Sequence, residues 1–595
     1  MQNRKKDHIN LCISKIKETW SRKNTNFLLG EWCLEYPDQK LQEYKIKKAK
    51  PFCINQKLKD IHYKRARNIE ERFLDYLITS LNDIHKTSFG KRFWKIILGH
   101  WVRRYVSIIY NRVISLNENI NNNEAYLFVC LKSNDYYMHT TNSSEIIWMA
   151  NDDVWNNLLY QKIFHFSKFK NISFQDINYN KKINTNDPNK KIFGLKRNLK
   201  FFIYNVYNFV MSLIYKDNDP VIINTYMPLK FEFLLQLKLK IFPRYFKNNF
   251  YNTSIKTNEN KRDYFYRKYK KKFDNDLDNC LYNIVWFCLP ICFLEGFSEL
   301  NYRTNKLRWP KNPKFIFTSN EFDSNEYFKF YTALKTENNS KYFVGQHGAG
   351  YGTHRYDTPL IEEETSDKFL CWGWGKNNSK YFNVFSFLNL RKKIKREYIK
   401  KKDCLMIFQN LGTRIEIEDL NYEYKVYWNS QLNFISLLSH NVYQNLNLRL
   451  FNLTPWNELE RLKNFDSDLN VHCKFDKNFI PLEKILQTTK IVIVTFDTTV
   501  ILELLINDIP FIGFWPNTLE KIRDSALPYY KNLIDNDLLF ETPEDAAKKV
   551  NEIWNNVDSW WNEESRLNAR KKYMKKFCKT SNTSINNLKD ILLNE

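Results

Sequence analysis

Short apolar runs that alternate with helix-length segments constrain the fold of this chain more than any other feature. Four such runs, rich in β-branched or aromatic residues, are Glu124–Leu131, Pro220–Tyr226, Lys314–Ser319 and Tyr342–Gln346. Strands separated by helices are typical of parallel sheets, because a parallel connection needs a crossover of about a dozen residues or more. The alternation therefore predicts an α/β fold.

A second series of strands follows the Gly- and Trp-rich segment Trp372–Gly375. Its members are Asp403–Gln409, Leu446–Phe451, Lys490–Phe496 and Pro510–Trp515. The run Lys490–Phe496 is nearly all apolar, which predicts a central strand covered on both faces. Because 595 residues are too many for one core, we predict two Rossmann-like domains, residues 1–365 and 366–560, followed by helices in 561–595 that pack back on the body.

The amino-terminal third combines helix patterns with isolated strands. Asn26–Trp32 is typical of a first strand, while Ile69–Ile84 and Phe93–Ile114 carry apolar residues at three- and four-residue spacing. We expect these two helices to pack together as an extra helical region. The two most apolar stretches, Phe201–Tyr215 and Cys280–Phe297, are interrupted by polar residues, and neither offers the roughly 20 apolar residues that a bilayer requires. We therefore expect two buried helices there.

Composition limits the possible partners. The net charge of +26 raises the question of nucleic acid, but lysine outnumbers arginine and accompanies abundant Asn and Ile throughout, so the signal is weak. The basic runs Lys261–Lys272 and Arg391–Lys402 are expected to be solvated, with attraction to an anionic inner membrane surface as the alternative. Met1–Lys17 lacks the apolar core of a secretory signal, which predicts a cytoplasmic protein. Eleven scattered cysteines without a CxxC predict neither disulfides nor structural zinc.

The glycine-rich segment Gly345–Gly352, GQHGAGYG, is the strongest local signal, because it holds four of only thirteen glycines directly after a strand. Glycines let backbone approach a ligand and expose N–H groups to an anion, so Gln346, Gly348 and Gly350 are predicted to bind substrate. His347 lies inside this turn and is predicted to accept a proton from an acceptor hydroxyl or to stabilise a leaving phosphate. The alternative is a tight turn in which His347 bonds a carbonyl.

The segment Thr495–Glu503, TFDTTVILE, follows the predicted central strand. Asp497, Thr498 or Thr499 can cap the helix that begins here, which leaves free N–H groups and a positive dipole end for a phosphate. Ligands bind at the carboxyl ends of the strands in open α/β sheets, and Glu503 is predicted to accept hydrogen bonds from sugar hydroxyls. An ordinary capped helix is the alternative.

Other charged residues give weaker signals. Arg449, on a predicted strand between apolar neighbours, needs an anionic partner, which can be a structural carboxylate or a substrate phosphate. Glu31 and Asp323 each follow a predicted strand and are candidates for a general base, or for helix caps. Asp466–Asp468 and Asp535–Asp537 have the Asp-x-Asp form of metal-dependent sugar transferases, but neither follows a convincing strand. No metal site is therefore predicted.

Segments spread over nearly the whole chain form a recognisable set: FLLGEWCLEY (27–36), FWKIILGHW (93–101), IFTSN (316–320), GQHGAGYG (345–352), SDKFLCWGWG (366–375), LRLF (448–451), TFDTTVILELLINDIP (495–510), RDSALPYY (523–530) and the Trp560-Trp561 pair. Together they resemble transferases of bacterial surface-carbohydrate loci, which are distantly similar to capsule-type GT-B glycosyltransferases. The resemblance implies a GT-B fold, a nucleotide-activated donor in the carboxyl-terminal domain and an acceptor in the amino-terminal one. His62-Tyr63, His100 and Ala349 depart from the family pattern.

These observations predict a metal-independent glycosyltransferase of surface polysaccharide biosynthesis, with no cofactor and no nucleic-acid partner. It would move a sugar from a nucleotide sugar to a glycan or lipid-linked acceptor, with peripheral contact to the inner membrane surface. Thr498, Thr499 and Arg449 would stabilise the leaving phosphate. Two alternatives stay open: transfer of a polyol phosphate from a CDP-activated donor, and a non-enzymatic basic protein that binds nucleic acid or a membrane surface.

Overall fold

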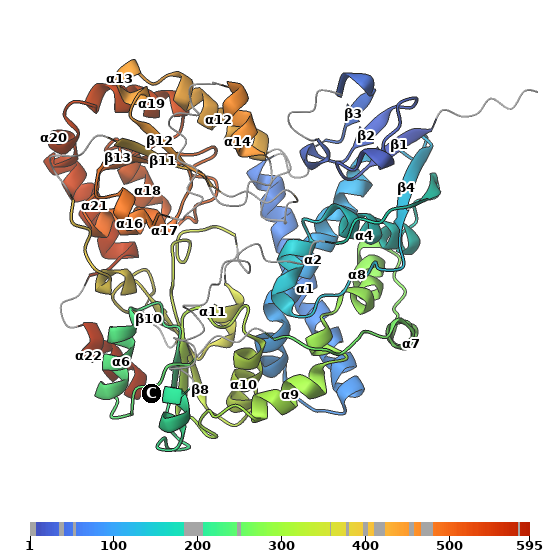
Figure 1. Cartoon of the computed structure of the whole chain (residues 1–595), viewed down its shortest axis with the longest axis horizontal. Helices are drawn as coiled ribbons and strands as arrows, with labels where there is room; N and C mark the ends of the chain where they lie inside the picture. Colours follow the sequence, from blue (N-terminus) through green and yellow to red (C-terminus); the bar gives the residue numbers. More distant parts are fainter. Residues whose placement is uncertain are drawn as a thin grey trace, which may run out of the picture.

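The computed structural model describes residues 8–34, 41–50, 55–183, 206–246, 251–356, 359–376, 380–396, 403–409, 414, 423–450, 457–465, 480–580 and 584–594. Within them the chain forms three five-stranded sheets, each covered by helices (Figure 1). Every recorded strand pair is parallel. The predicted α/β fold is therefore confirmed.

The first sheet was not predicted as a separate unit. Its strands, in spatial order, are β3 (Ile46–Lys48), β2 (Asn26–Leu28), β1 (Ile9–Cys12), β4 (Tyr126–Lys132) and β5 (Ile172–Asn178). Only β4 and the start of the run Asn26–Trp32 were expected. The remaining strands are short or polar, and a buried hydrogen bond of 3.1 Å from Asn10 to Asn26 joins β1 to β2. Such strands lack the apolar run that identifies a strand in sequence.

Two long helices form the predicted helical region and connect the first two sheets. They are α1 (Gln56–His85) and α2 (Lys91–Asn119), and they pack on each other. Helix α2 also contacts α8 (Asp276–Cys288) and α10 (Glu326–Glu337). It is buried on almost every side, because helices of both neighbouring units cover it.

The second and third sheets are the two predicted Rossmann-like units. The order in the second is β10 (Tyr381–Asn383), β9 (Lys368–Cys371), β8 (Lys341–Gly345), β7 (Phe315–Thr318), β6 (Val221–Ile223). The order in the third is β12 (Leu446–Arg449), β11 (Asp403–Ile407), β13 (Thr489–Val494), β14 (Phe511–Phe514), β15 (Leu539–Phe540). Residues 491–494 of β13 are fully buried, which confirms the predicted central strand.

The GT-B-like arrangement predicted from the sequence is confirmed, since the second and third units face each other across a cavity of about 440 Å³. The boundary between them lies later than residue 366, because β9 and β10 pair with β8. The chain ends with α21 (Glu564–Phe577), which packs on the third unit, and α22 (Ser584–Leu593), which contacts α6 (Leu229–Lys238) of the second.

The two strongly apolar stretches have different environments. Helix α8 is buried, with Leu281, Ile284 and Trp286 inaccessible to solvent, as predicted. The described part of the other stretch contains a helical segment at 206–212, and its large apolar side chains are exposed. For this part the prediction of a buried helix was wrong, because the helix packs on the body through its polar residues; residues 201–205 of the stretch lie outside the described residues. No described helix has the length and apolarity to cross a membrane.

Candidate functional site

Three loops meet at the carboxyl edge of the second sheet, after β6, β7 and β8. The backbone N–H of Ser319, after β7, donates to the Asn224 carbonyl at 3.1 Å, and its hydroxyl donates to the Thr225 carbonyl at 3.0 Å. Tyr226 has φ +66°, a left-handed conformation that an aromatic residue rarely adopts and that often occurs at functional sites. Hydrogen bonds therefore join the loops after β6 and β7 at this edge, and the backbone of Tyr226 is strained.

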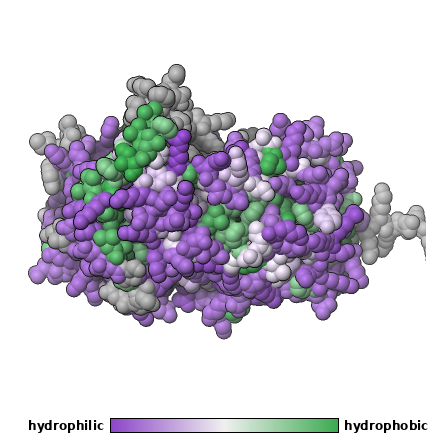
Figure 2. Space-filling view, turned by 90° about the horizontal axis from the view of Figure 1, so that it is seen from below, coloured by the Kyte–Doolittle hydropathy of each residue, from purple (hydrophilic) through white to green (hydrophobic). Residues whose placement is uncertain are grey.

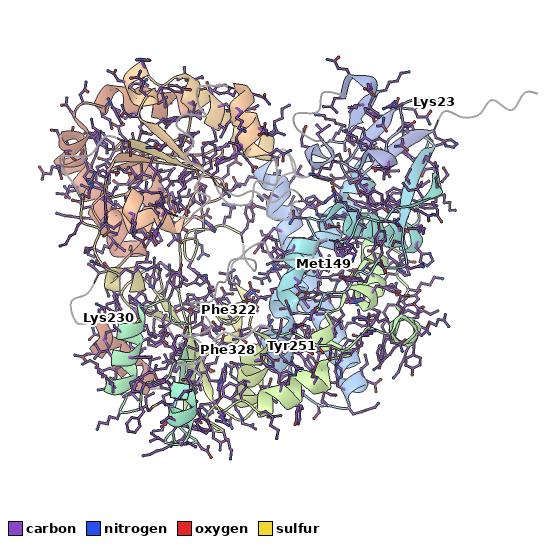
Figure 3. All side chains as sticks on the ribbon, viewed as in Figure 1. Lys23, Met149, Lys230, Tyr251, Phe322 and Phe328 are labelled. Carbon is purple, nitrogen blue, oxygen red and sulfur yellow. The ribbon has the colours of Figure 1, made fainter. Side chains whose placement is uncertain are left out.

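His347 lies among three aromatic rings at this edge of the sheet. Its ring centroid is 5.7 Å from Tyr226, 5.9 Å from Phe322 and 5.4 Å from Tyr351. Phe322 is buried and is labelled near the middle of the view in Figure 3. Burial lowers the pKa of His347 to about 4, although the charge of Asp323 and a hydrogen bond to the Ser319 backbone oppose this shift. The imidazole is therefore neutral near pH 7 and able to accept a proton.

A buried hydrogen-bond chain extends from His347 through Tyr351 to Glu362, which lies near His100 of α2. Nδ1 of His347 lies 3.1 Å from the Tyr351 hydroxyl, which donates to Oε1 of Glu362 at 2.6 Å. Glu362, on α11 (Ile361–Thr365), has its pKa raised to about 7 by burial. Its Oε2 lies 3.6 Å from Nε2 of His100, and burial lowers the pKa of His100 to about 3. The chain can therefore exchange a proton with His347 near neutral pH.

The other two candidate bases lie in less suitable surroundings. Asp323 accepts two hydrogen bonds from Arg104, at 2.7 and 2.8 Å, and although burial opposes it, this guanidinium holds the pKa of the carboxyl well below its usual range. A carboxylate held this way is a weak base. Glu31, at the carboxyl edge of the first sheet, forms an ion pair with Nζ of Lys48 at 2.9 Å. Glu31 and His347 therefore lie at the edges of two different sheets.

Gln346 uses its side chain to shape the glycine-rich loop. Its Nε2 donates to the Gly348 carbonyl at 2.9 Å. Its Oε1 accepts from the Trp372 backbone N–H at 2.9 Å and from Nε1 of Trp374 at 2.8 Å. The amide is buried and already has these partners, which hold the shape of the loop that contains His347.

The glycines of the loop serve two purposes. Gly350 has φ +93°, a left-handed conformation that glycine adopts without strain. At Gly348 the reason is space, since a Cβ there would lie 2.8 Å from Oγ1 of Thr499. The loop thus forms a tight turn and also packs closely against the third unit.

Helix α17 (Thr499–Ile506) begins at this contact. Thr498, one of the three caps that the sequence offered, is the N-cap, and its hydroxyl accepts from the Val500 N–H at 3.5 Å. Oγ1 of Thr499 accepts a hydrogen bond from the Ala349 backbone N–H at 2.9 Å. Asp497 does not cap the helix; its Oδ2 accepts from the Tyr530 hydroxyl at 2.7 Å and lies 3.3 Å from Nε2 of His354. The glycine-rich loop and the helix start are therefore direct neighbours.

The cavity between the units is lined by the later part of α17, with Glu503 and Ile506, and by Asn507. Glu503 lines it and forms an ion pair with Arg391, whose guanidinium lies 5.0 Å from the centroid of the Tyr226 ring. Burial raises the pKa of Glu503. Lys392, Lys393 and Lys395 also line the cavity. The described part of this basic run therefore faces an interdomain space and is not simply a solvated surface.

Arg449 ends the edge strand β12, at the carboxyl edge of the third sheet. Its guanidinium donates to the Ile480 carbonyl at 3.2 Å. Among the described residues no carboxylate forms an ion pair with it, so the predicted anionic partner is not identified there.

The two Asp-x-Asp triplets differ in what the structure describes. Asp466–Asp468 lies outside the described residues. Asp537 forms ion pairs with Arg566 at 3.0 Å and Lys549 at 3.3 Å. In the described ranges, no three His, Cys, Asp or Glu side chains form a group suited to a metal.

Several residues of the site were missed in the sequence. Tyr351 stands four positions after His347 in the same loop, which is the signal that was available. Glu362 belongs to an acidic triplet, and Arg391 to a basic run that resembled a solvated surface. His354 and His100 carry no local signal. These residues make their contacts with side chains that come from distant parts of the chain.

Comparisons with known proteins give weak structural likenesses and one extensive family match. The wall teichoic acid polymerase TagF is 12% identical, with 68% of this chain and 98% of that chain covered and a TM-score of 0.32. Anabaena Alr3699/HepE, in complex with UDP and glucose, is 9% identical, with 64% and 100% covered and a TM-score of 0.32. WaaG, a glycosyltransferase involved in lipopolysaccharide biosynthesis, is 10% identical, with 79% and 100% covered and a TM-score of 0.24. No curated protein matches the sequence. The family model described as LIC12162 family transferase matches residues 9–592.

Proposed function

Because the chain belongs to the LIC12162 family of transferases, we propose that it transfers a sugar from a nucleotide-activated donor to a surface-carbohydrate acceptor, either lipid-linked or a glycan. One observation carries the proposal: the hydrogen bond from Ala349 to Thr499 brings the His347 loop against the start of α17. A candidate base and a candidate phosphate site therefore belong to one junction between two Rossmann-like units.

The third unit is assigned the donor. The start of α17 presents backbone N–H groups and a positive dipole end at the carboxyl edge of its sheet, where α/β proteins bind phosphates. Arg391 and three lysines line the adjoining cavity. As the bond between sugar and diphosphate breaks, negative charge develops on the leaving phosphate. Fixed N–H groups and cations stabilise that charge more in the transition state than in the ground state.

The second unit is assigned the acceptor. His347 is neutral, and its Nδ1 lies 3.1 Å from the Tyr351 hydroxyl. Nε2 is the atom assigned to the acceptor hydroxyl, which would take the place of the ring's hydrogen bond to the Ser319 backbone. The acceptor oxygen attacks the anomeric carbon, its proton passes to Nε2, and the nucleoside diphosphate leaves with the bonding electrons. The imidazolium that forms is stabilised by the chain to Glu362 and by the charge of Asp323. Gln346, Gly348 and Gly350 are assigned to holding this loop in place.

The proposed reaction uses no metal ion and no further cofactor. The positive charge at the leaving group comes from the chain itself, through α17, Arg391 and, from the edge of the third sheet, Arg449. The donor is a substrate. Glu503, beside Arg391, is assigned to hydroxyls of the donor sugar or ribose.

The test is turnover with a panel of nucleotide sugars, after a thermal-shift screen selects those that raise the melting temperature. His347→Ala is expected to lower kcat by at least about a hundredfold while the donor-induced shift persists. The matched control is His165→Ala, at an exposed histidine of the first unit. Near-normal turnover of His347→Ala would remove the residue from the mechanism. A polyol-phosphate product from a CDP-activated donor would replace the proposed reaction.

A further inference from the structure

The outer side of the second unit carries a set of large apolar side chains that nothing in the described structure covers. They belong to segment 206–214, to α6 and to the residues just after α6, and we call them the apolar face. Its members are Val206, Phe209, Val210, Leu213, Ile214, Leu229, Leu234, Leu237 and Phe242. Leu213 is 72% exposed, Phe242 58% and Leu237 57%. Figure 2 shows an apolar band on the left of the lower face, on the side where α6 lies in Figure 1.

These side chains form one surface because the segments that carry them are joined. In the helical segment 206–212, the Tyr207 hydroxyl donates to the Pro243 carbonyl at 2.7 Å, and the Asn208 amide donates to the Tyr245 carbonyl. Gln236 of α6 exchanges two hydrogen bonds with the backbone of Arg244, at 2.7 and 3.0 Å. Segment 243–245 therefore connects both helices.

The polarity of segment 206–212 is reversed relative to an ordinary surface helix. Its polar residues Tyr207 and Asn208 face the body, while Phe209 and Val210 face outward. A surface helix of a soluble domain normally buries its apolar stripe. Large apolar side chains that are exposed together usually mark a binding site for a partner or a membrane.

Cations surround the apolar face. Lys216, Lys230 and Lys240 are exposed in the same segments, and the Arg308 guanidinium lies 4.3 Å from the centroid of the Phe209 ring. Figure 3 shows Lys230 at the periphery of the molecule, away from Phe322. Asp217 is exposed in the same region, so the cations outnumber the acidic side chains. Apolar residues bordered by Lys and Arg are typical of surfaces that lie in the headgroup region of an anionic bilayer.

We propose that the apolar face docks the protein on a lipid bilayer that contains anionic lipids. A second copy of the chain is a poorer occupant, because two identical faces would bring their lysines together without compensating anions. The bilayer supplies both an apolar layer for Phe209, Leu213 and Leu237 and negative charge for the rim. This inference does not rest on the proposed function, since it concerns binding without a substrate.

The experiment is sedimentation of the full chain with vesicles of phosphatidylcholine, with and without phosphatidylglycerol. The protein is expected to bind the vesicles that contain phosphatidylglycerol, and less so as salt increases. Phe209→Ser with Leu213→Ser is expected to lower the partition coefficient at least about tenfold. Lys230→Glu with Lys240→Glu is expected to lower it similarly on anionic vesicles.

The matched control is Ile61→Ser with Phe174→Ser, which replaces one aliphatic and one aromatic residue that are exposed elsewhere. It is expected to bind as the unchanged chain does, and circular dichroism with melting temperatures verifies that all variants fold. Absence of vesicle binding by the unchanged chain, or equal binding by the Phe209/Leu213 variant and the control, would overturn the proposal. So would a lipid-free dimer that the Phe209/Leu213 variant abolishes, because the face would then be an interface between copies.

Discussion

Oγ1 of Thr499 accepts a hydrogen bond from the backbone N–H of Ala349 at 2.9 Å, although the two residues belong to different Rossmann-like units. The contact depends on Gly348, whose missing side chain leaves room for the threonine hydroxyl. A second link lies nearby, where Nε2 of His354 is 3.3 Å from Oδ2 of Asp497. These direct contacts hold the glycine-rich loop against the start of α17.

Gly348→Ala is expected to lower turnover at least about tenfold, because its Cβ would lie 2.8 Å from Oγ1 of Thr499 and separate the two units. Thr499→Ala alone costs about 1 kcal/mol of stability through the lost hydrogen bond. The double variant is expected to regain most of the turnover lost in Gly348→Ala, since the clash is gone. A double-mutant cycle on kcat measures this coupling. Gly90→Ala is the control, because its Cβ would meet the flexible carboxylate of Glu337 at 3.2 Å.

The pH profile of turnover is expected to follow His347. Its pKa of about 4 means that the base is unprotonated above that pH, so kcat falls as the pH is lowered through about 4. Tyr351→Phe removes the hydroxyl between His347 and Glu362, and we expect kcat to fall about tenfold. The control is Tyr342→Phe, whose hydroxyl is buried without a hydrogen-bond partner in the described structure. An unchanged kcat in Tyr351→Phe would exclude the chain from the reaction.

Glu362→Gln is expected to change how stability depends on pH. Burial raises the pKa of this carboxyl from 4.5 to about 7 in the folded state, so the folded protein binds the proton more tightly than the unfolded chain. The contribution is present below about pH 4.5 and is lost as the pH rises to about 7. Glu362→Gln does not lose this contribution. Above that pH, its free energy of unfolding should therefore exceed that of the unchanged protein by up to about 3 kcal/mol. Urea denaturation across this range measures it.

The exposed residue Glu259 supplies the control for that series. Glu259→Gln should follow the unchanged protein at every pH. A free-energy difference between Glu362→Gln and the unchanged protein that stays constant with pH would show that Glu362 does not titrate in this range.

Removal of divalent metal ions is expected to leave turnover within about twofold. The physical reason is that α17, Arg391 and Arg449 are assigned the charge stabilisation that a metal would otherwise supply at the leaving phosphate. The measurement is kcat after dialysis against a chelator, with and without added Mg²⁺ or Mn²⁺. A loss of activity that either ion restores would contradict the metal-independent reaction.

Local pattern in the sequence predicted most strands of the two Rossmann-like units, though not β9, β10 or β15, and a helix cap at one of Asp497, Thr498 and Thr499. The run at 490–496 predicted a central strand because uninterrupted apolar residues can be buried only between two covered faces. The first sheet was not recognised as a unit because β1 and β3 have four and three residues, too few for a periodic pattern, and β5 is mostly polar. The prediction for segment 206–214 failed because its apolar residues were expected to be buried, whereas they are exposed.

What only the tertiary structure decided is which side chains meet. The contacts of His347 with Tyr226 and Phe322, of Tyr351 with Glu362, and of Ala349 with Thr499 join segments from separate strands and separate units. Periodicity reports how one segment is buried, but it holds no information on which distant segment covers it. Hydrogen bonds and pKa shifts depend on that partner, so much of the secondary structure followed from the sequence, but the chemistry of the site followed from the packing.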